Sequence, residues 1–151
     1  MANFNKITYA LIIFVLLFIG VSRAQLTDSG IGEKKFIYFK NNSFLVEVAA
    51  TKQQQEKGLM FVRSLPTNSG MLFVYADETP RSFYMKNTYI PLDLIWMDRE
   101  KKVVFIKKDA KPATLDGYET ICPQEEAMYV LELNAGSSDR IGLRIGDKLQ
   151  F

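Results

Sequence analysis

Runs of hydrophobic residues separated by short polar segments extend from residue 35 to residue 151, and their spacing is mostly that of β-strands. Residues 35–40 and 43–50 are rich in β-branched and aromatic side chains. Asn41 and Asn42 lie between them and predict a tight hairpin turn, because asparagine tolerates a positive φ. Further strands are predicted at residues 71–75, 81–85, 92–98, 103–107, 127–133 and 148–151, with residues 112–123 irregular.

Helical signals are fewer and shorter. Thr51 and Gln54 have the spacing of a capping box at the start of a helix. Residues 53–57 favour a helix, and Gly58 can end it in the left-handed region. Residues 137–142 predict a helical turn or a second short helix. Because strands outnumber helices and most connections are hairpin-length, we predict an α+β fold: a mostly antiparallel sheet or partly closed β-barrel with one or two short helices.

Residues 1–24 have the pattern of a secretory signal peptide. Lys6 provides the positive start, residues 9–21 form a 13-residue apolar stretch, and Ala24 precedes the predicted cleavage point. A retained membrane anchor is the alternative, but a spanning helix needs about 20 apolar residues. The pattern therefore favours an exported protein, periplasmic or extracellular after cleavage, that contacts a membrane only through the uncleaved leader.

The chain is predicted to have three parts. A signal peptide at residues 1–24 is followed by a polar, glycine-containing lead-in at residues 25–33, which we expect to be flexible. The remainder, residues 34–151, is expected to form a single β-rich domain. A chain of this size buries roughly two thirds of its unfolded surface, which is enough for one unaided core.

Net charge argues against a nucleic-acid partner. The chain has 19 basic and 17 acidic residues, but two of the basic ones, Lys6 and Arg23, lie in the predicted leader. The rest of the chain therefore carries 17 of each sign. A neutral protein lacks the electrostatic attraction to phosphate on which most nucleic-acid binding depends.

The chain contains no histidine and one cysteine, Cys122. The lack of histidine excludes a Ser-His-Asp or Cys-His triad, an imidazole base and any His-containing zinc site. A single cysteine excludes an internal disulfide, and we expect Cys122 to pack as a small residue before Pro123. Chemistry by carboxylates, Lys, Tyr or Ser, or an oxygen-liganded Ca²⁺ or Mg²⁺ site, remains open. Because the spacing of metal and phosphate loops is missing, no cofactor is predicted.

The polar segment Lys86-Asn87-Thr88 interrupts an apolar part of the chain and is the first candidate site. In the strand that follows, both faces are apolar except at Asp93, so the strand is expected to be central and the carboxylate buried. A buried carboxylate needs a partner. In one interpretation Asp93 orients Lys86, which binds an acidic or hydroxyl-rich ligand together with Asn87 and Thr88. In the other, these four residues form a satisfied polar network without a ligand.

Three more charged residues belong to the candidate set. Arg63 and Arg140 could join Lys86 around an anionic ligand, although each also fits a surface position. Glu132 lies on the apolar face of a predicted strand and could be buried. Paired with Asp93, it would form a two-carboxylate hydrolytic site. The alternative is that Glu132 pairs with Arg140 or a lysine.

Several motifs occur in a fixed order from residue 51 onward: Thr51 with Gly58-Leu59-Met60, then Gly70-Met71-Leu72-Phe73, then Phe83-Tyr84-Met85-Lys86-Asn87-Thr88 with Ile90-Pro91-Leu92-Asp93, then Tyr129-Val130-Leu131-Glu132-Leu133 with Ala135-Gly136, Gly142 and Gly146-Asp147. Over about residues 44–151 this order resembles the domain of unknown function 192 family. The family has no accepted activity. The resemblance implies a compact, β-dominated, often exported domain whose hallmark is the segment from Met85 to Asp93.

The chain departs from the family pattern at two positions. Tyr84 stands where the family usually has tryptophan, and Gln55 stands where it often has arginine. If that arginine contributes to a site in relatives, Gln55 cannot supply its charge.

Three functions are consistent with these patterns. We expect an exported binding or accessory module that recognises a small polar ligand or an envelope partner, because binding requires only a preorganised polar cluster. The first alternative is a hydrolase or lyase that uses Asp93 and Glu132, with Lys86 stabilising negative charge. The second is a structural envelope protein without a ligand.

Overall fold

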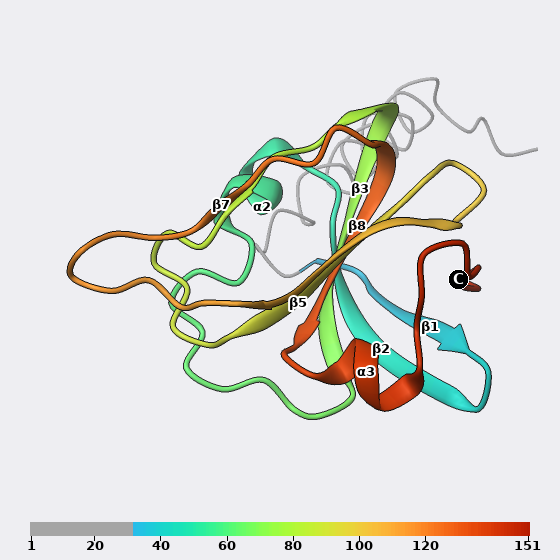
Figure 1. Cartoon of the computed structure of the whole chain (residues 1–151), viewed down its shortest axis with the longest axis horizontal. Helices are drawn as coiled ribbons and strands as arrows, with labels where there is room; N and C mark the ends of the chain where they lie inside the picture. Colours follow the sequence, from blue (N-terminus) through green and yellow to red (C-terminus); the bar gives the residue numbers. More distant parts are fainter. Residues whose placement is uncertain (1–31) are drawn as a thin grey trace, which may run out of the picture. The chain divides into compact units, whose positions relative to one another are not determined.

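Eight strands and two short helices occupy residues 32–151, the part of the chain that this computed structural model describes (Figure 1). In chain order they are β1 (Lys34–Phe39), β2 (Asn42–Ala49), α2 (Lys52–Lys57), β3 (Ser69–Pro80), β4 (Phe83–Tyr84), β5 (Leu92–Met97), β6 (Val103–Ala110), β7 (Thr120–Ile121), β8 (Glu126–Asn134) and α3 (Ser137–Ile141). The predicted signal peptide and residues 25–31 of the lead-in lie outside the described residues. Between residues 32 and 151, no helix is long and apolar enough to cross a membrane.

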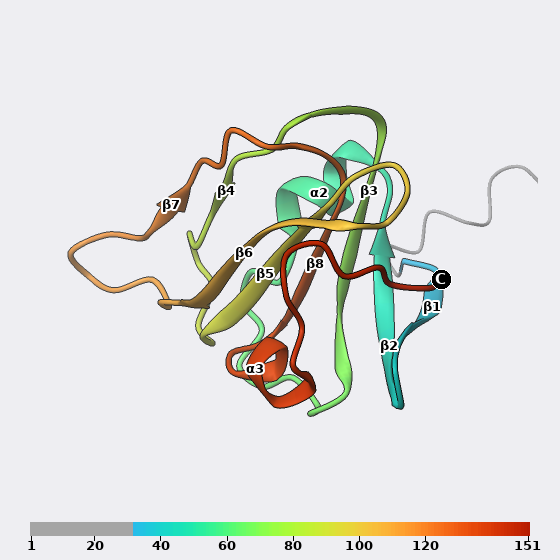
Figure 2. The same ribbon diagram turned by 45° about the vertical axis from the view of Figure 1, so that its right-hand side comes forward.

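Six strands form one mixed sheet in the order β1-β2-β3-β8-β5-β6, and β4 pairs with β7 in a separate ribbon. Only β2 and β3 run parallel among the paired strands of the described residues. The predicted α+β class with a mostly antiparallel sheet is therefore confirmed. The sheet stays open, with β1 and β6 at its edges, so it does not close into a barrel (Figure 2).

The C-terminal segment lies between the two edges of the sheet without forming the predicted strand at residues 148–151. Tyr38 of β1 forms an isolated bridge with Gln150, and Lys102, just before β6, forms one with Lys148. The same segment makes further backbone hydrogen bonds at the start of β6, from the Gly146 N–H to the Val103 carbonyl oxygen and from the Val103 N–H to the Asp147 carbonyl oxygen, both at 2.8 Å. These contacts link the two edges without a continuous strand between them.

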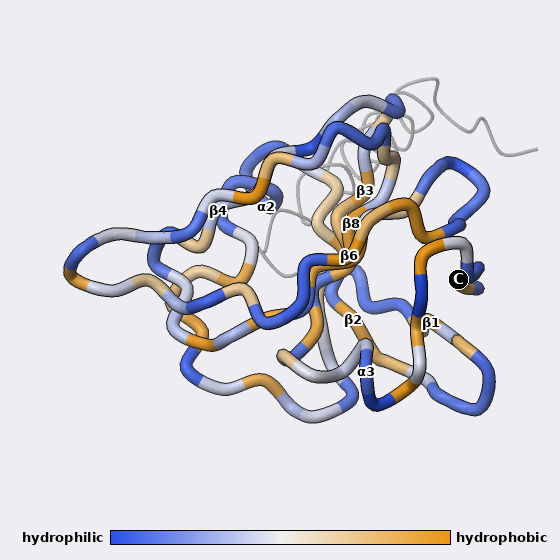
Figure 3. The backbone as a smooth tube through the Cα atoms, in the orientation of Figure 1, coloured by the Kyte–Doolittle hydropathy of each residue, from blue (hydrophilic) through white to orange (hydrophobic). Residues whose placement is uncertain are grey.

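The sheet separates two hydrophobic cores, and β5 contributes to both. Leu92, Leu94 and Trp96 pack in the core on the side of α2 and the β4–β7 ribbon. Ile95 and Met97 pack in the other core, which also contains apolar side chains of β1, β2 and α3. Figure 3 shows hydrophobic segments gathered where the strands cross and hydrophilic ones in the outer loops. The prediction that β5 is a central strand is therefore confirmed.

Local signals predicted the first turn and helix closely. Phe39 lies opposite Asn42, so the hairpin loop is Lys40-Asn41, one residue earlier than predicted, and Lys40 has the positive φ of 51°. The capping box at α2 is present, with the Thr51 side chain accepting from the Gln54 N–H at 3.3 Å and Gln54 Oε1 accepting from the Thr51 N–H at 3.0 Å.

Three other predictions needed correction. Gly58 has a φ of 47° and a ψ of −138°, so its φ is positive but the residue lies outside the left-handed helical region. The strand predicted at residues 71–75 extends over all of β3, through a register shift between Val74 and Thr79. The strand β7 lies in a segment that was predicted to be irregular. The sequence did not predict it because a strand of two residues has no detectable periodicity.

Candidate functional site

Asp93 is completely buried in β5, and its carboxylate accepts three hydrogen bonds. The N–H and hydroxyl of Ser138 donate to Oδ2 at 2.9 and 2.6 Å, and the N–H of Asp109 donates to Oδ1 at 3.0 Å. Ser138 lies in the first turn of α3, where backbone N–H groups lack partners within the helix. Asp93 therefore attaches α3 and the end of β6 to the centre of the sheet.

The expected contact between Asp93 and Lys86 is not formed. Lys86 is exposed and takes part in no ion pair within residues 32–151. The segment from Met85 to Thr88 is a hydrogen-bonded turn, with the Thr88 N–H 3.1 Å from the Met85 carbonyl oxygen and Asn87 at a φ of 55°. This turn exposes Lys86, whereas the Asp93 oxygens are already bonded to Ser138 and Asp109.

The strand register separates Asp93 from Glu132. In the β5–β8 pair, Asp93 lies opposite Leu133, and Leu94 lies opposite Glu132. Directly opposed residues share one face of a sheet, and successive residues alternate between faces. The two carboxyl groups therefore lie on opposite faces of the sheet. The predicted hydrolytic pair of Asp93 and Glu132 is wrong.

Glu132 is buried without a partner. It is 6% exposed, and its Oε2 atom has no hydrogen-bond partner among the described residues. Burial raises the pKa of Glu132 to about 8, so the carboxyl is mostly protonated at neutral pH. The alternative pairing of Glu132 with Arg140 or a lysine is not formed among the described residues. Arg140 lies over the Phe44 ring and donates to Asn68 Oδ1 at 3.5 Å.

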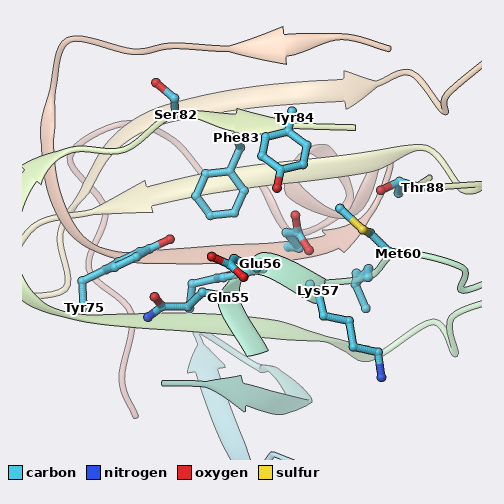
Figure 4. A pocket seen from close by; sticks show the side chains of 13 residues that line it. Gln55, Glu56, Lys57, Met60, Tyr75, Ser82, Phe83, Tyr84 and Thr88 are labelled. Atoms are coloured by element: carbon cyan, nitrogen blue, oxygen red, sulfur yellow. The ribbon is translucent and has the colours of Figure 1, made fainter. Parts of the chain in front are cut away.

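Glu132 lines a pocket that lies between α2, β3 and the segment from β4 to Thr88. The empty space measures about 390 Å³, counting its open mouth. Figure 4 shows Gln55 and Glu56 of α2 across the pocket from Phe83 and Tyr84 of β4. Tyr75 and Thr88 lie toward its two ends in the same view. The pocket thus combines aromatic rings with polar groups around a buried carboxyl, as small-molecule sites commonly do.

The Gln55 amide and the Tyr75 ring, which line the pocket together with Glu132, contact other groups. Gln55 donates from Nε2 to the Val74 carbonyl oxygen at 2.8 Å. Burial raises the pKa of Tyr75 to about 12, an effect that the Arg81 charge opposes and the Glu132 charge reinforces. The Arg81 guanidinium lies 4.0 Å from the centre of the Tyr75 ring and forms an ion pair with Asp77.

The structure brings two of the six predicted site residues, Thr88 and Glu132, into this pocket. Lys86 and Arg63 are exposed outside its lining, and Arg63 lies 5.2 Å from the centre of the Tyr89 ring. Asn87 is half-buried, and its carbonyl oxygen accepts from the Phe61 N–H at 2.8 Å. Asp93, the sixth, lies on the opposite face of the sheet, where it accepts hydrogen bonds from Ser138 of α3.

Gln55 and Tyr75 are among the pocket residues that had no functional prediction from the sequence. Gln55 was identified only as a departure from the family pattern, and Tyr75 lies in a predicted strand whose pairing no local signal indicates.

Cys122, which was expected to be packed, is exposed. Between residues 32 and 151, no three side chains of Cys, Asp or Glu are grouped so that they could hold a metal ion.

Comparisons with known proteins place the chain among relatives that are themselves little defined. A protein of Sinorhizobium meliloti 1021, proposed to be a transcription regulator, has a solved structure that is 33% identical, with a TM-score of 0.74 over 79% of this chain and 94% of that one. A protein of unknown function from Novosphingobium aromaticivorans DSM 12444 is 30% identical, with a TM-score of 0.74 over 83% of this chain and 89% of that one. No curated protein matches the chain. The sequence profile of DUF192, described as "Uncharacterized ACR", matches residues 37–151, and the chain belongs to this family.

Proposed function

We propose that the domain binds a small polar ligand in the pocket between α2 and β4, and that Glu132 is the group that recognises it. The observation that carries the proposal is the Glu132 carboxyl, which is buried without a partner and lines an open pocket. Leaving a buried polar group unpaired costs about 1–3 kcal/mol. A ligand that supplies the missing hydrogen bond recovers this free energy on binding.

Further polar groups around the pocket support a directed contact with a ligand. Thr88 is buried, and Tyr84 is 45% exposed with its hydroxyl directed from β4 toward α2 in Figure 4. A ligand bound to Glu132 can therefore meet two hydroxyl groups. Lys86, on the turn before Thr88, can contact a ligand that extends beyond the pocket.

We place this binding module outside the cytoplasm, as an accessory protein of the envelope or the medium. The support is the leader pattern of residues 1–24. Direct binding to nucleic acid is one way in which a regulatory role of the kind proposed for the Sinorhizobium protein could be exercised. The balanced charge of residues 25–151 favours a small ligand instead.

The test is a thermal-shift screen of the protein against sugars, nucleotides, amino acids and amines. We expect at least one class to raise the melting temperature, because a ligand that binds only the folded state stabilises it. Glu132→Gln should abolish the shift. The matched control is Glu100→Gln, the same substitution at an exposed hairpin residue, which should preserve it. A shift unaffected by Glu132→Gln would contradict the proposal, and so would a screen without any shift.

A further inference from the structure

Four aromatic side chains line the same pocket as the Glu132 carboxyl: Phe73, Tyr75, Phe83 and Tyr84. Phe73 and Phe83 hold each other edge to face, with ring centroids 4.8 Å apart. The face of an aromatic ring carries negative charge density and attracts a cation within about 6 Å of its centre. Aromatic rings and an acidic group that line one pocket favour a positively charged ligand.

The basic side chains of the domain do not occupy this space. Besides its ion pair with Asp77, Arg81 donates to the carbonyl oxygens of Asp77 at 2.8 Å and Ala127 at 3.4 Å. Lys57 lines the pocket, but it forms no ion pair within the described residues. Its ammonium is directed away from the other labelled side chains in Figure 4. The neutral Gln55 has no charge to offer Glu132.

We infer that the ligand carries a primary ammonium group, which enters the pocket and donates a hydrogen bond to the Glu132 carboxyl. The inference rests on the proposed function and names its ligand class. An ammonium group is a compact charge with three donors, so it can serve Glu132 and the Tyr84 or Thr88 hydroxyl together. A quaternary ammonium has no donor, and a planar guanidinium is larger and makes its strongest contact with both carboxylate oxygens together.

Binding of the ammonium group releases a proton. In the free protein the Glu132 carboxyl keeps its proton at neutral pH, and the ligand charge favours the carboxylate. The carboxyl O–H bond breaks, its proton goes to the solvent, and an ammonium–carboxylate pair remains. The other charged or titratable groups around the pocket are Tyr75 of β3, Tyr84 of β4, Glu56 and Lys57 of α2, and Arg81 beyond the Tyr75 ring. Affinity should therefore rise about tenfold per pH unit below pH 8 and level off above it.

Calorimetric titration of the full chain with n-butylammonium and with n-butanol tests the inference. We expect the amine to bind at least about tenfold more tightly than the alcohol, because the alcohol lacks the charge. The affinity for n-butylammonium should rise about tenfold per pH unit below pH 8. The carbon-13 resonance of the Glu132 carboxyl should show ionisation when the amine binds.

Two variants complete the experiment. Glu132→Gln keeps the size and neutral state of the free side chain, and it should weaken amine binding at least about tenfold and remove its pH dependence. Gln55→Arg places a guanidinium in the pocket, and it should block the amine while the protein stays folded. Equal affinity for amine and alcohol would overturn the inference, as would amine binding that Glu132→Gln leaves unchanged. If a neutral ligand binds in a Glu132-dependent manner and amines do not, this inference fails and the proposed function stands.

Discussion

Asp93 and Glu132 are two buried carboxyl groups on neighbouring strands, and they differ in their partners. Asp93, at the base of α3, accepts three hydrogen bonds from Ser138 and Asp109. Glu132, on the opposite face, lines a pocket, and its Oε2 has no partner in the described domain. Burial alone therefore does not distinguish a structural acid from a candidate binding acid. The number of internal donors does, because a satisfied carboxylate stabilises the fold and an unsatisfied one leaves a bond for a ligand to make.

Removing the satisfied carboxylate should have the largest effect. Asp93→Ala leaves the donors of Ser138 and Asp109 without an acceptor and opens a cavity between β5 and α3. We expect the free energy of unfolding to fall by about 3–5 kcal/mol in urea titrations. A loss below about 1 kcal/mol would show that the network does not hold α3 to the sheet.

Removing the unsatisfied Glu132 carboxyl should change the free energy of unfolding by a smaller amount and in the opposite direction, raising it by an amount that depends on pH. The pKa of Glu132 is about 8 in the folded protein against an ordinary value of 4.5, so between these values the native state binds more protons than the unfolded chain. The free energy of unfolding should therefore decrease as the pH rises through this window, by on the order of a few kcal/mol. Glu132→Gln should remove this decrease and be more stable than the wild type above pH 8.

Unfolding of both proteins across this pH range measures the difference. Glu100→Gln serves as the control, since this exposed residue should leave the wild-type profile unchanged. A wild-type stability that stays constant between these two pKa values would mean that Glu132 has a partner in solution.

The contrast between the two acids was only partly predictable from the sequence. The burial of Asp93 follows from the apolar pattern of β5, and that of Glu132 from the same kind of pattern in β8, since strand periodicity is a local signal. Their separation depends on the register of β5 against β8, which sequence periodicity does not give. The partners of Asp93 are equally non-local: Ser138 is 45 residues away along the chain. Likewise, the parallel pairing of β2 with β3 and the contact of β4 with β7 join segments whose sequences carry no sign of each other.

Substitution of Ser138 tests a single hydrogen bond of the Asp93 carboxylate. Ser138→Ala removes the hydroxyl donor to Asp93 and keeps the backbone N–H donor. Because one of three hydrogen bonds to a charged group is lost, we expect a loss of about 1.5–3 kcal/mol in the free energy of unfolding. Ser137→Ala is the matched control at the adjacent buried serine, which is not among the residues that donate to Asp93. Equal losses in the two variants would assign the effect to packing of α3 and not to the hydrogen bond.

Substitution of Lys86 should change stability least, because Lys86 contributes neither to the Asp93 hydrogen bonds nor to the Glu132 pocket. Its side chain is exposed, forms no ion pair within the described domain and does not line the Glu132 pocket. Lys86→Met should therefore change the free energy of unfolding by less than about 0.5 kcal/mol in urea titrations. It should also keep the thermal shift caused by n-butylammonium, since the ammonium group binds at Glu132. A strongly destabilised variant would instead mean that Lys86 takes part in a structural polar network, as one interpretation of the sequence predicts.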